Sequence, residues 1–414
     1  RRATRLSRYA RQTLEADPGL LAPGSVCAAF SADEMRKYLE AAGAADEATL
    51  KRLLRELRKR VMLRLIARDL GGLATLDEVV ATVTSLADIT ISAAVAFLEL
   101  RLADEYGTPI GKDSNTEQKL HVVGMGKLGG KELNVSSDID LVFVYPEDGE
   151  TRGARPLSNH EFFTRTARRL IALLNEMTAD GYVFRVDMRL RPLGAEGPLA
   201  CSFDMLENYF ITQGREWERY AWIKGRVVYG DRAPELNDLV QPFVYRRHLD
   251  YSAFESLREL HREVRREVER RDILDNIKLG PGGIREIEFI TQLFQLIRGG
   301  RDAALRDPST RAVLPLLGAH NFLPQSAVLD LSAAYAFLRN LEHRLQYLDD
   351  RQTQTLPENG DDRALIAAAM DVPDYSALRE RLAHHRANVT RVFVSIFASS
   401  EEHSHRLVVL WRAG

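Results

Sequence analysis

Hydrophobic residues in the first part of the chain recur at the spacing of helices. One series places apolar side chains every three or four positions, with Arg and Lys on the other face, at Leu50, Leu53, Leu54, Leu57 and Val61. Two capping boxes, Ser31 to Glu34 and Thr75 to Glu78, mark the starts of helices, because the hydroxyl and the glutamate satisfy free backbone amides. We therefore expect a helical region over residues 1–106, with packed apolar faces and solvated charges.

After residue 107 the pattern changes to short apolar runs that alternate with a helix. Residues 120–123, 138–145 and 182–190 have the composition of strands. A capping box at Ser158 to Glu161 begins the intervening helix. The apolar side of that helix is formed by Phe163, Ala167, Leu170, Leu174 and Met177. This alternation predicts a small α/β domain over residues 107–232.

From residue 243 to residue 414 the pattern is again helical. An apolar seam with 3-4-3-4 spacing is formed by Phe254, Leu257, His261, Val264 and Val268. We expect His261 to be a packed core residue, and further helices over residues 334–348 and 375–399. The chain as a whole is thus expected to be predominantly helical, of the α+β class.

Composition and charge limit the classes of partner. The 57 basic and 59 acidic residues give a net charge of -2, which does not favour a nucleic-acid partner. Cys27 and Cys201 lack CxxC spacing, so we expect no zinc site or disulfide and a cytoplasmic location. We find no apolar run near the roughly 20 residues that span a bilayer, and expect no membrane contact. The chain has no initiating Met, which suggests a piece of a longer protein.

A glycine-rich turn follows the first expected strand. Gly124 to Gly129 matches G-x-G-x-x-G. A dinucleotide-binding fold needs a crossover of a dozen or more residues before its next strand, whereas only residues 130–137 precede the strand at Asp138, so that interpretation is rejected. The exposed amides of the turn can hold phosphate oxygens, and Lys127 adds a positive charge. Alternatively, the glycines let the backbone pass close to a neighbouring strand.

Two carboxylates stand at the entrance of the second strand. Asp138 and Asp140 lie two positions apart, so both side chains point to one face of the strand. Adjacent carboxylates repel each other and are costly to desolvate unless a cation lies between them. Mg²⁺ is the leading candidate, with Mn²⁺ as an alternative, because such hard cations take oxygen ligands and bridge to substrate phosphates.

The third expected strand carries a face of charged side chains. That face consists of Arg185, Asp187, Arg189 and Arg191. Asp187 would add a third carboxylate, and three carboxylates can hold the two ions of an in-line phosphoryl displacement. The arginines would grip phosphates through their forked geometry. The alternative is an exposed edge strand with surface ion pairs.

Two further clusters each have two interpretations. Residues 216–226, which include Lys224, mix aromatic and charged side chains that could stack on a base and contact phosphate, or could form a partly buried helix. Residues 280–289 form a glycine turn before a helix with acids in its first turns, which suits the helix dipole without further function.

Several of these motifs occur together in one known family. They are residues 124–133 (GMGKLGGKEL), 136–140 (SSDID), 186–192 (VDMRLRP), 218–221 (ERYA) and 282–289 (GGIREIEF). In this order they closely resemble the bifunctional glutamine synthetase adenylyltransferase/adenylyl-removing enzymes. The resemblance implies a polymerase-β-like nucleotidyltransferase domain with a mixed sheet, flanked by helical domains.

The resemblance also implies roles for individual residues. It makes Asp138, Asp140 and Asp187 the catalytic, metal-binding carboxylates. The expected contacts to nucleotide or phosphate are Gly126, Lys127, Gly129, Ser137, Arg189, Arg191 and Lys224.

The family contains two related transferase domains, of which the N-terminal one removes AMP and the C-terminal one attaches it. The lead into Asp138 and the Arg285–Glu286 pair resemble the removing half. The implied reaction is phosphorolysis of tyrosyl-AMP on adenylylated glutamine synthetase, giving ADP, with the PII signal protein as a further partner. The alternatives are the forward transfer from ATP, a non-catalytic module that docks glutamine synthetase or PII, and a nucleic-acid-directed nucleotidyltransferase. The three aspartates argue against the non-catalytic module.

Overall fold

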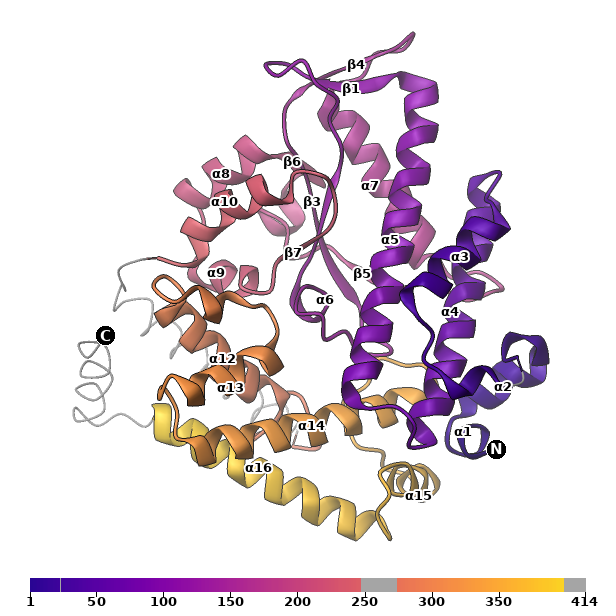
Figure 1. The fold of residues 1–414 in the computed structure, drawn as a ribbon, viewed down its shortest axis with the longest axis vertical. Coiled ribbons are helices and arrows are strands. Elements are labelled where there is room, and N and C mark those ends of the chain that lie inside the picture. Colours follow the sequence, from indigo (N-terminus) through magenta and orange to yellow (C-terminus); the bar gives the residue numbers. More distant parts are fainter. Residues whose placement is uncertain (23, 247–273, 398–414) are drawn as a thin grey trace. The chain divides into compact units, whose positions relative to one another are not determined.

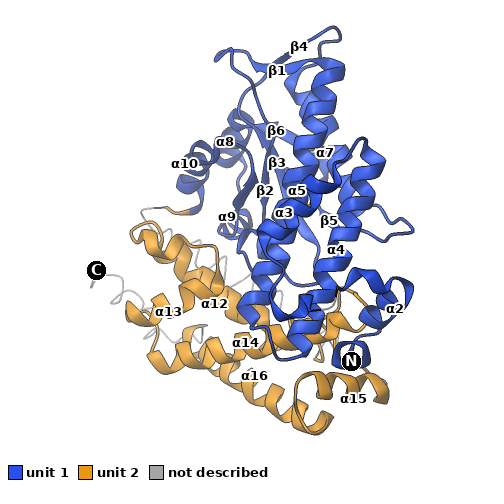
Figure 2. Ribbon diagram, turned by 45° about the vertical axis from the view of Figure 1, so that its right-hand side comes forward, with its two compact units in different colours: residues 1–244 blue, residues 245–414 orange. Residues whose placement is uncertain are grey.

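The computed structural model describes residues 1–22, 24–246 and 274–397 (Figure 1). The chain divides into two compact units, residues 1–244 and residues 245–414 (Figure 2). The division falls beside residue 243, where the third region was expected to begin. Residues 1–106 and 107–232 belong to the same unit, and their separation into two domains stays a prediction. The expected helix that contains His261 lies outside the described residues.

The helical start of unit 1 is confirmed. Its helices are α1 (Arg2–Leu6), α2 (Arg8–Ala16), α3 (Ala32–Ala42), α4 (Glu47–Leu70) and α5 (Leu76–Tyr106), with 3₁₀ turns η1 (Pro18–Leu20) and η2 (Ser25–Cys27). The apolar series on α4 is buried throughout, with each of its side chains at most 6% exposed. Ser31 and Glu34 form a complete capping box at the start of α3. Thr75 caps α5 through the Glu78 amide, while the Glu78 carboxylate binds Arg68 of α4.

Helix α5 corrects the expectation about apolar runs. It contains an 18-residue stretch that is long and apolar enough to cross a membrane. Asp88 lies in the middle of the apolar part of this helix. Within unit 1, 67% of that stretch is buried, and the helix packs against α3, α4 and α7. The burial indicates a core helix.

A small mixed sheet forms the centre of unit 1. Its strands, together with those of a separate ribbon, are β1 (Thr108–Gly111), β2 (His121–Gly124), β3 (Ile139–Tyr145), β4 (Gly149–Arg152), β5 (Val186–Asp187), β6 (Ala200–Ser202) and β7 (Arg226–Tyr229). The strand order is β5-β3-β2-β7, and β6 also pairs with β3. Strand β2 is antiparallel to β3 and β7, whereas β5 and β6 run parallel to β3. Strands β1 and β4 form the separate antiparallel ribbon.

Helices cover both faces of this sheet. They are α6 (Gly126–Gly129), α7 (Asn159–Asn175), α8 (Phe203–Thr212), α9 (Glu216–Trp222) and α10 (Ala233–Val244), with the 3₁₀ turn η3 (Gly194–Glu196). Figure 1 shows α5 and α7 on one side of the sheet and α8 and α10 on the other. Phe163 of α7 stacks on Tyr145 of β3, with ring centroids 4.9 Å apart. Met177 lies beyond the end of α7 and is 68% exposed, so its expected place on the apolar side of the helix is wrong.

The third expected strand is much shorter than predicted. Only Val186 and Asp187 pair with β3, and the chain then turns away through Leu193, whose φ is 61°. Arg191 stabilises this turn by donating to the carbonyls of Met188 (2.8 Å) and Ala195 (3.2 Å). The alternation of basic and apolar residues over 182–190 therefore belongs mostly to loops held by side chains, and the expectation of a long strand is wrong.

Unit 2 is helical in its described part. Its elements are α12 (Ile284–Arg298), η4 (Ala303–Arg306), α13 (Thr310–Ala319), α14 (Gln325–Tyr347), α15 (Gly360–Ala369) and α16 (Tyr375–Phe397). The glycine turn before α12 has a structural reason. Gly282 has a φ of 66°, and a Cβ there would lie 2.3 Å from the Arg386 carbonyl oxygen of α16. The Glu286 carboxylate accepts from the Gly282 amide at 3.1 Å, so this acid braces the start of the helix.

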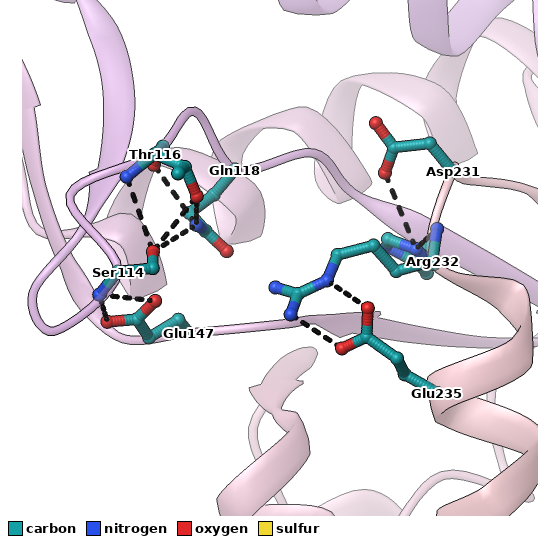
Figure 3. A network of polar contacts seen from close by, with 8 residues as sticks. Ser114, Thr116, Gln118, Glu147, Asp231, Arg232 and Glu235 are labelled. Carbon is teal, nitrogen blue, oxygen red and sulfur yellow. Dashed lines mark hydrogen bonds and ion pairs between the residues drawn. The ribbon is translucent and has the colours of Figure 1, made fainter.

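One buried histidine ties β2 to the start of α10. His121 has no exposed side-chain surface, and its Nε2 accepts from the Arg232 amide at 2.9 Å while Nδ1 faces the Lys119 carbonyl at 3.1 Å. Arg232 itself pairs with Glu235, beside Asp231 (Figure 3). Burial lowers the pKa of His121 below its ordinary value of 6.5, and the nearby Asp231 carboxylate opposes this only in part. Protonation of Nε2 would also remove the acceptor for the Arg232 amide.

Acid should therefore destabilise the protein through His121. The unfolded chain takes up this proton near pH 6.5 and the folded chain only at lower pH, so stability falls as pH drops below 6.5, down to the folded pKa. Within that window the loss from one proton is at most about 1.4 kcal/mol per pH unit. His121→Gln should flatten the dependence of urea-unfolding free energies between pH 7 and pH 5. His160→Gln, at an exposed position on α7, is the control. Equal acid sensitivity of His121→Gln and the parent protein would contradict this account.

Candidate active site

Two of the three predicted carboxylates are brought together by the sheet. Asp140 is the second residue of β3, and Asp187 is the second and last residue of β5. The two strands run parallel, with Asp140 directly opposite Asp187 in the register. Side chains of register partners project from the same face of a sheet. Residues predicted from separate parts of the sequence thus meet as neighbours, and Asp138 lies one position before β3.

Asp138 is held by an arginine from the loop before β5. Arg185 Nε donates to the Asp138 carboxylate at 2.7 Å, and both side chains are 31% exposed. The same guanidinium donates to the Tyr182 hydroxyl at 2.7 Å and to the Ser136 carbonyl at 2.8 Å. With these partners Arg185 serves to hold the entrance of β3, and its guanidinium is occupied by protein groups.

Asp187 is held by the arginine that follows it. Arg189 donates to the Asp187 carboxylate from its backbone amide (2.8 Å) and its Nε (2.8 Å). Burial by itself would raise the pKa of Asp187, but the hydrogen bonds and charge of Arg189 outweigh it and lower that pKa. The pKa of Arg189 is raised, first by its hydrogen bond to Asp187, then by the charge of Asp187, and also by the charges of Asp140 and Asp138. Arg189 therefore lies in the combined field of all three carboxylates.

The three carboxylates have the right chemistry for a divalent cation, but their side chains are not close enough together in this structure to bind one ion. Within the described residues, no group of three His, Cys, Asp or Glu side chains is close enough to hold one metal ion. The donors are nevertheless hard oxygen ligands on neighbouring strand positions, as Mg²⁺ or Mn²⁺ requires. Arg185 and Arg189 supply the positive charge that balances them here, and the side chain of Arg189 is 85% exposed. The exposed Arg189 side chain has room to move away from Asp187, which would free the Asp187 carboxylate for a cation.

The glycine turn packs directly against the start of β3. The Met125 amide donates to the Asp140 carbonyl at 2.9 Å. Gly126 has a φ of 55°, and a Cβ there would lie 3.0 Å from Asp140 Oδ2. A Cβ on Gly129 would lie 1.6 Å from the Lys224 carbonyl oxygen. Close backbone approach is thus an actual role of these glycines, and α6, the helix within the turn, is only four residues long.

This packing brings most of the predicted contact residues into one region. Gly126 and Gly129 lie in the turn, with the half-buried Lys127 between them. Ser137, also half-buried, precedes Asp138, and Lys224 lies behind the turn with its side chain buried. A contact of any of these residues with nucleotide or phosphate stays a prediction. Arg191 is turned to backbone carbonyls of its own loop, so its expected place on a strand face beside Asp187 is wrong.

Helix α9 favours the packing interpretation of residues 216–226. Glu218 accepts from the Tyr209 hydroxyl at 2.6 Å and from the Arg215 amide at 2.9 Å. Arg219 donates to the Phe243 carbonyl at 3.0 Å. Trp222 is buried, while Trp217 is 39% exposed. The charged side chains of this helix thus join α8 and α10, and a base-stacking role is left to Trp217.

Helix α5 supports the glycine turn in a way that the sequence interpretation missed. Asp88 accepts from Arg226 of β7 at 2.9 Å, and Arg226 also donates to the Leu128 carbonyl at 3.1 Å. The Thr84 hydroxyl accepts from the Leu133 amide at 3.3 Å. A charged residue between the largely apolar residues 79–87 and 89–98 was the signal for this contact.

A second polar network lies at the β1–β4 ribbon. The Glu147 carboxylate accepts from the backbone amides of Asp113 and Ser114, and Gln118 donates to the Thr116 carbonyl at 3.1 Å (Figure 3). Burial tends to raise the pKa of Glu147, but hydrogen bonds from Ser114 and Asp113 lower it overall. These contacts fold the loop after β1 and include none of the three aspartates.

Comparison with known proteins gives two family matches. Residues 3–241 match the family described as glutamate-ammonia ligase adenylyltransferase. Residues 258–397 match the family described as GlnD PII-uridylyltransferase.

Curated relatives carry one name, bifunctional glutamine synthetase adenylyltransferase/adenylyl-removing enzyme. The protein from Nitrosomonas eutropha is 58% identical over 376 residues, which cover 89% of this chain and 40% of that protein. The Nitrosomonas europaea protein is 56% identical over 402 residues, covering 95% and 43% respectively. The Aromatoleum aromaticum protein is 52% identical over 415 residues, covering 100% and 44%.

The chain thus spans less than half the length of these relatives. The adenylyltransferase family match includes the whole sheet, the glycine turn and all three aspartates, and it extends over more than half of the chain. On this evidence the chain belongs to the glutamate-ammonia ligase adenylyltransferase family.

Proposed function

We propose that this chain removes AMP from adenylylated glutamine synthetase by phosphorolysis of a tyrosyl-AMP bond. The observation that carries the proposal is the pair of register partners Asp140 and Asp187, facing Arg189 beside the glycine turn, in a chain of this family. The names of the relatives supply glutamine synthetase as the target. We further propose that unit 1 has the polymerase-β-like arrangement, with β3 and β5 presenting the carboxylates.

The proposed reaction is a direct in-line displacement. An oxygen of inorganic phosphate bonds to the α-phosphorus of the tyrosyl-AMP as the bond from that phosphorus to the tyrosine oxygen breaks. The products are ADP and a free tyrosine, whose phenolate oxygen takes up a proton. Asp138, Asp140 and Asp187 would hold Mg²⁺ or Mn²⁺, which supplies Lewis acidity at the phosphoryl oxygens.

The residues of this chain contribute charge and position. Arg189 is an exposed cation bound to Asp187, and it would turn from Asp187 to the attacking phosphate. Arg185 keeps Asp138 oriented through its bond at 2.7 Å. The glycine turn allows phosphate groups to approach the backbone next to Asp140. Such preorganised charge accounts for most of the catalysis in phosphoryl transfer.

The forward reaction, transfer of AMP from ATP to glutamine synthetase, is the second candidate. One observation favours it: residues 258–397 match the family of PII-uridylyltransferase, which by its name attaches a nucleotide. The same match supports PII as a partner. The chemistry of the carboxylate site is the same in both directions. Our preference for removal rests on the resemblance of the residues around Asp138 and of the Arg285–Glu286 pair to the removing half.

Loss of one carboxylate should remove activity while leaving the fold intact. Asp140→Asn replaces an anionic ligand by a neutral amide, so we expect a fall in turnover of roughly 100-fold or more. The melting temperature should change by no more than about 2–4 °C, because the substitution also relieves repulsion between carboxylates. Asp113→Asn in the exposed loop after β1 is the matched control. Normal turnover of Asp140→Asn would rule out the metal assignment.

Arg189 should contribute to phosphate binding more than to stability. Arg189→Ala removes an exposed side chain, so we expect a melting temperature close to that of the parent protein and a KM for phosphate raised by about 10-fold. Arg168→Ala, an exposed arginine on α7, is the control. A lower melting temperature with unchanged kinetics would instead support a surface ion pair without function.

The direction of the reaction can be tested on its products. With adenylylated glutamine synthetase and Mg²⁺, we expect ADP to form only when inorganic phosphate is present. A parallel assay offers ATP and unmodified glutamine synthetase and measures AMP incorporation. Release of free AMP without phosphate, or incorporation of AMP from ATP at a comparable rate, would contradict the assignment to removal.

A further inference from the structure

The loop that leads to Asp187 is held from outside the sheet. Residues 176–185, here called the α7–β5 loop, connect the end of α7 to β5. Arg185 at the end of this loop binds Asp138, and the Ile139 amide donates to the Arg185 carbonyl at 2.9 Å. Because β5 itself contributes only two residues to the sheet, the position of Asp187 depends on whatever fixes this loop.

A buried arginine of α4 makes that connection. The Arg55 side chain donates to the Gly181 carbonyl at 2.8 Å, the Leu173 carbonyl at 3.0 Å and the Glu176 carbonyl at 2.5 Å. The last carbonyls of a helix lack partners within the helix, and Arg55 satisfies them at the end of α7. Only 1% of Arg55 is exposed. Its planar fork fits several diverging acceptors, which a lysine ammonium cannot match.

Other basic residues of α4 hold the first half of the same loop. Lys51 pairs with Glu176, and Lys59 pairs with Asp180 at 3.2 Å. These partly exposed pairs are individually weak. Together they align the face of α4 that carries Arg55 with residues 176–180 of the α7–β5 loop.

The ring of Tyr182 lies between an arginine of α4 and the arginine that binds Asp138. The Arg58 guanidinium lies 4.6 Å from the ring centre of Tyr182, and that of Arg185 lies 5.1 Å from it. The Tyr182 hydroxyl accepts from Arg185 at 2.7 Å. Tyr182 thus connects α4 with the arginine that orients Asp138.

We propose that Arg55 is a positioning residue for the carboxylate site, acting through the α7–β5 loop to set the places of Arg185 and Asp187. The N-terminal helices would then contribute to catalysis, because α4 would fix the positions of Asp138 and Asp187 through the loop. This proposal rests on the proposed function for its activity readout, but its structural core concerns the loop alone.

A purely structural role gives a different expectation. Burial of a cation is costly, and loss of the guanidinium leaves several carbonyls without donors, so some loss of stability is expected in either case. A positioning role adds a loss of turnover in the fraction that is folded. A displacement of about 1 Å at reacting groups can cost roughly 100-fold in rate.

The test compares three variants of the whole chain. Arg55→Met keeps most of the side-chain volume and removes the donors. Arg52→Met is the matched control, because Arg52 lies on the exposed face of α4 and changes the charge equally. Tyr182→Phe keeps the ring and removes the hydroxyl that orients Arg185. If Arg55→Met does not fold, this variant still tests the later step of the connection, from the loop to Arg185.

Hydrogen exchange supplies the readout that does not depend on the reaction. We expect Arg55→Met to speed amide exchange within residues 176–187 while β2 and β3 stay protected, and Arg52→Met to change neither. Uniform loss of protection throughout unit 1, or no change in the loop, would overturn the proposal. The exchange measurement tests the role of Arg55 independently of activity. If the parent protein shows neither AMP removal nor AMP transfer, only the proposed function fails.

Kinetics supply the second readout. Turnover per folded molecule should fall about 10-fold or more for Arg55→Met, and less for Tyr182→Phe, with the KM for phosphate within about 2-fold of the parent value. Because Asp187 would be held less firmly in place, the affinity for Mn²⁺ should also fall. This affinity is measured by electron paramagnetic resonance in the absence of substrate. Unchanged turnover and unchanged Mn²⁺ affinity in a folded Arg55→Met or Tyr182→Phe protein would show that the contact is structural only.

Discussion

The close approach of the glycine turn to two other segments is the constraint on which the site depends. A Cβ on Gly129 would overlap the Lys224 carbonyl at 1.6 Å, and one on Gly126 would crowd the Asp140 carboxylate at 3.0 Å. The backbone of the turn therefore packs directly against the residue 224 segment and lies beside the Asp140 carboxylate of β3. Any side chain at Gly129 would push the turn away from the residue 224 segment. Close contact between backbone segments keeps the glycine turn next to the carboxylates.

Charge balance is the second requirement, since three carboxylates in a partly buried region repel one another. The protein answers it with two arginines of different character. Arg185 is engaged by Asp138, Tyr182 and Ser136, and so forms part of the framework. Arg189 is largely exposed and bound through its neighbour Asp187. A site with one fixed and one movable cation can hold its shape and still exchange positive charge with a ligand.

The sequence predicted the parts of unit 1 that follow from local spacing. The apolar series on α4, the strands β2 and β3, and the meeting of Asp140 with Asp187 all followed from periodicity and motif order. The long strand over residues 182–190 was wrong, because a loop held by arginines shows the same alternation as a strand. Arg55 was taken as solvated charge, since helical spacing does not reveal that the last carbonyls of α7 lie opposite it. The role of Asp88 in α5 was missed for a similar reason, because its partner Arg226 is distant in sequence.

The two-residue length of β5 has a consequence for how the protein assembles. Val186 and Asp187 pair with residues far away along the chain, and so short a ladder does little to offset the entropy of closing the intervening loop. Strands β2 and β3 and helix α7 can form from nearer contacts, and β5 can dock only once they provide a surface. The chemistry of this enzyme family member is thus expected to be completed in the last step of folding. By the same reasoning, the pairing of Asp187 with Asp140 depends on the contacts that hold the α7–β5 loop, and we expect it to be lost when those contacts open locally.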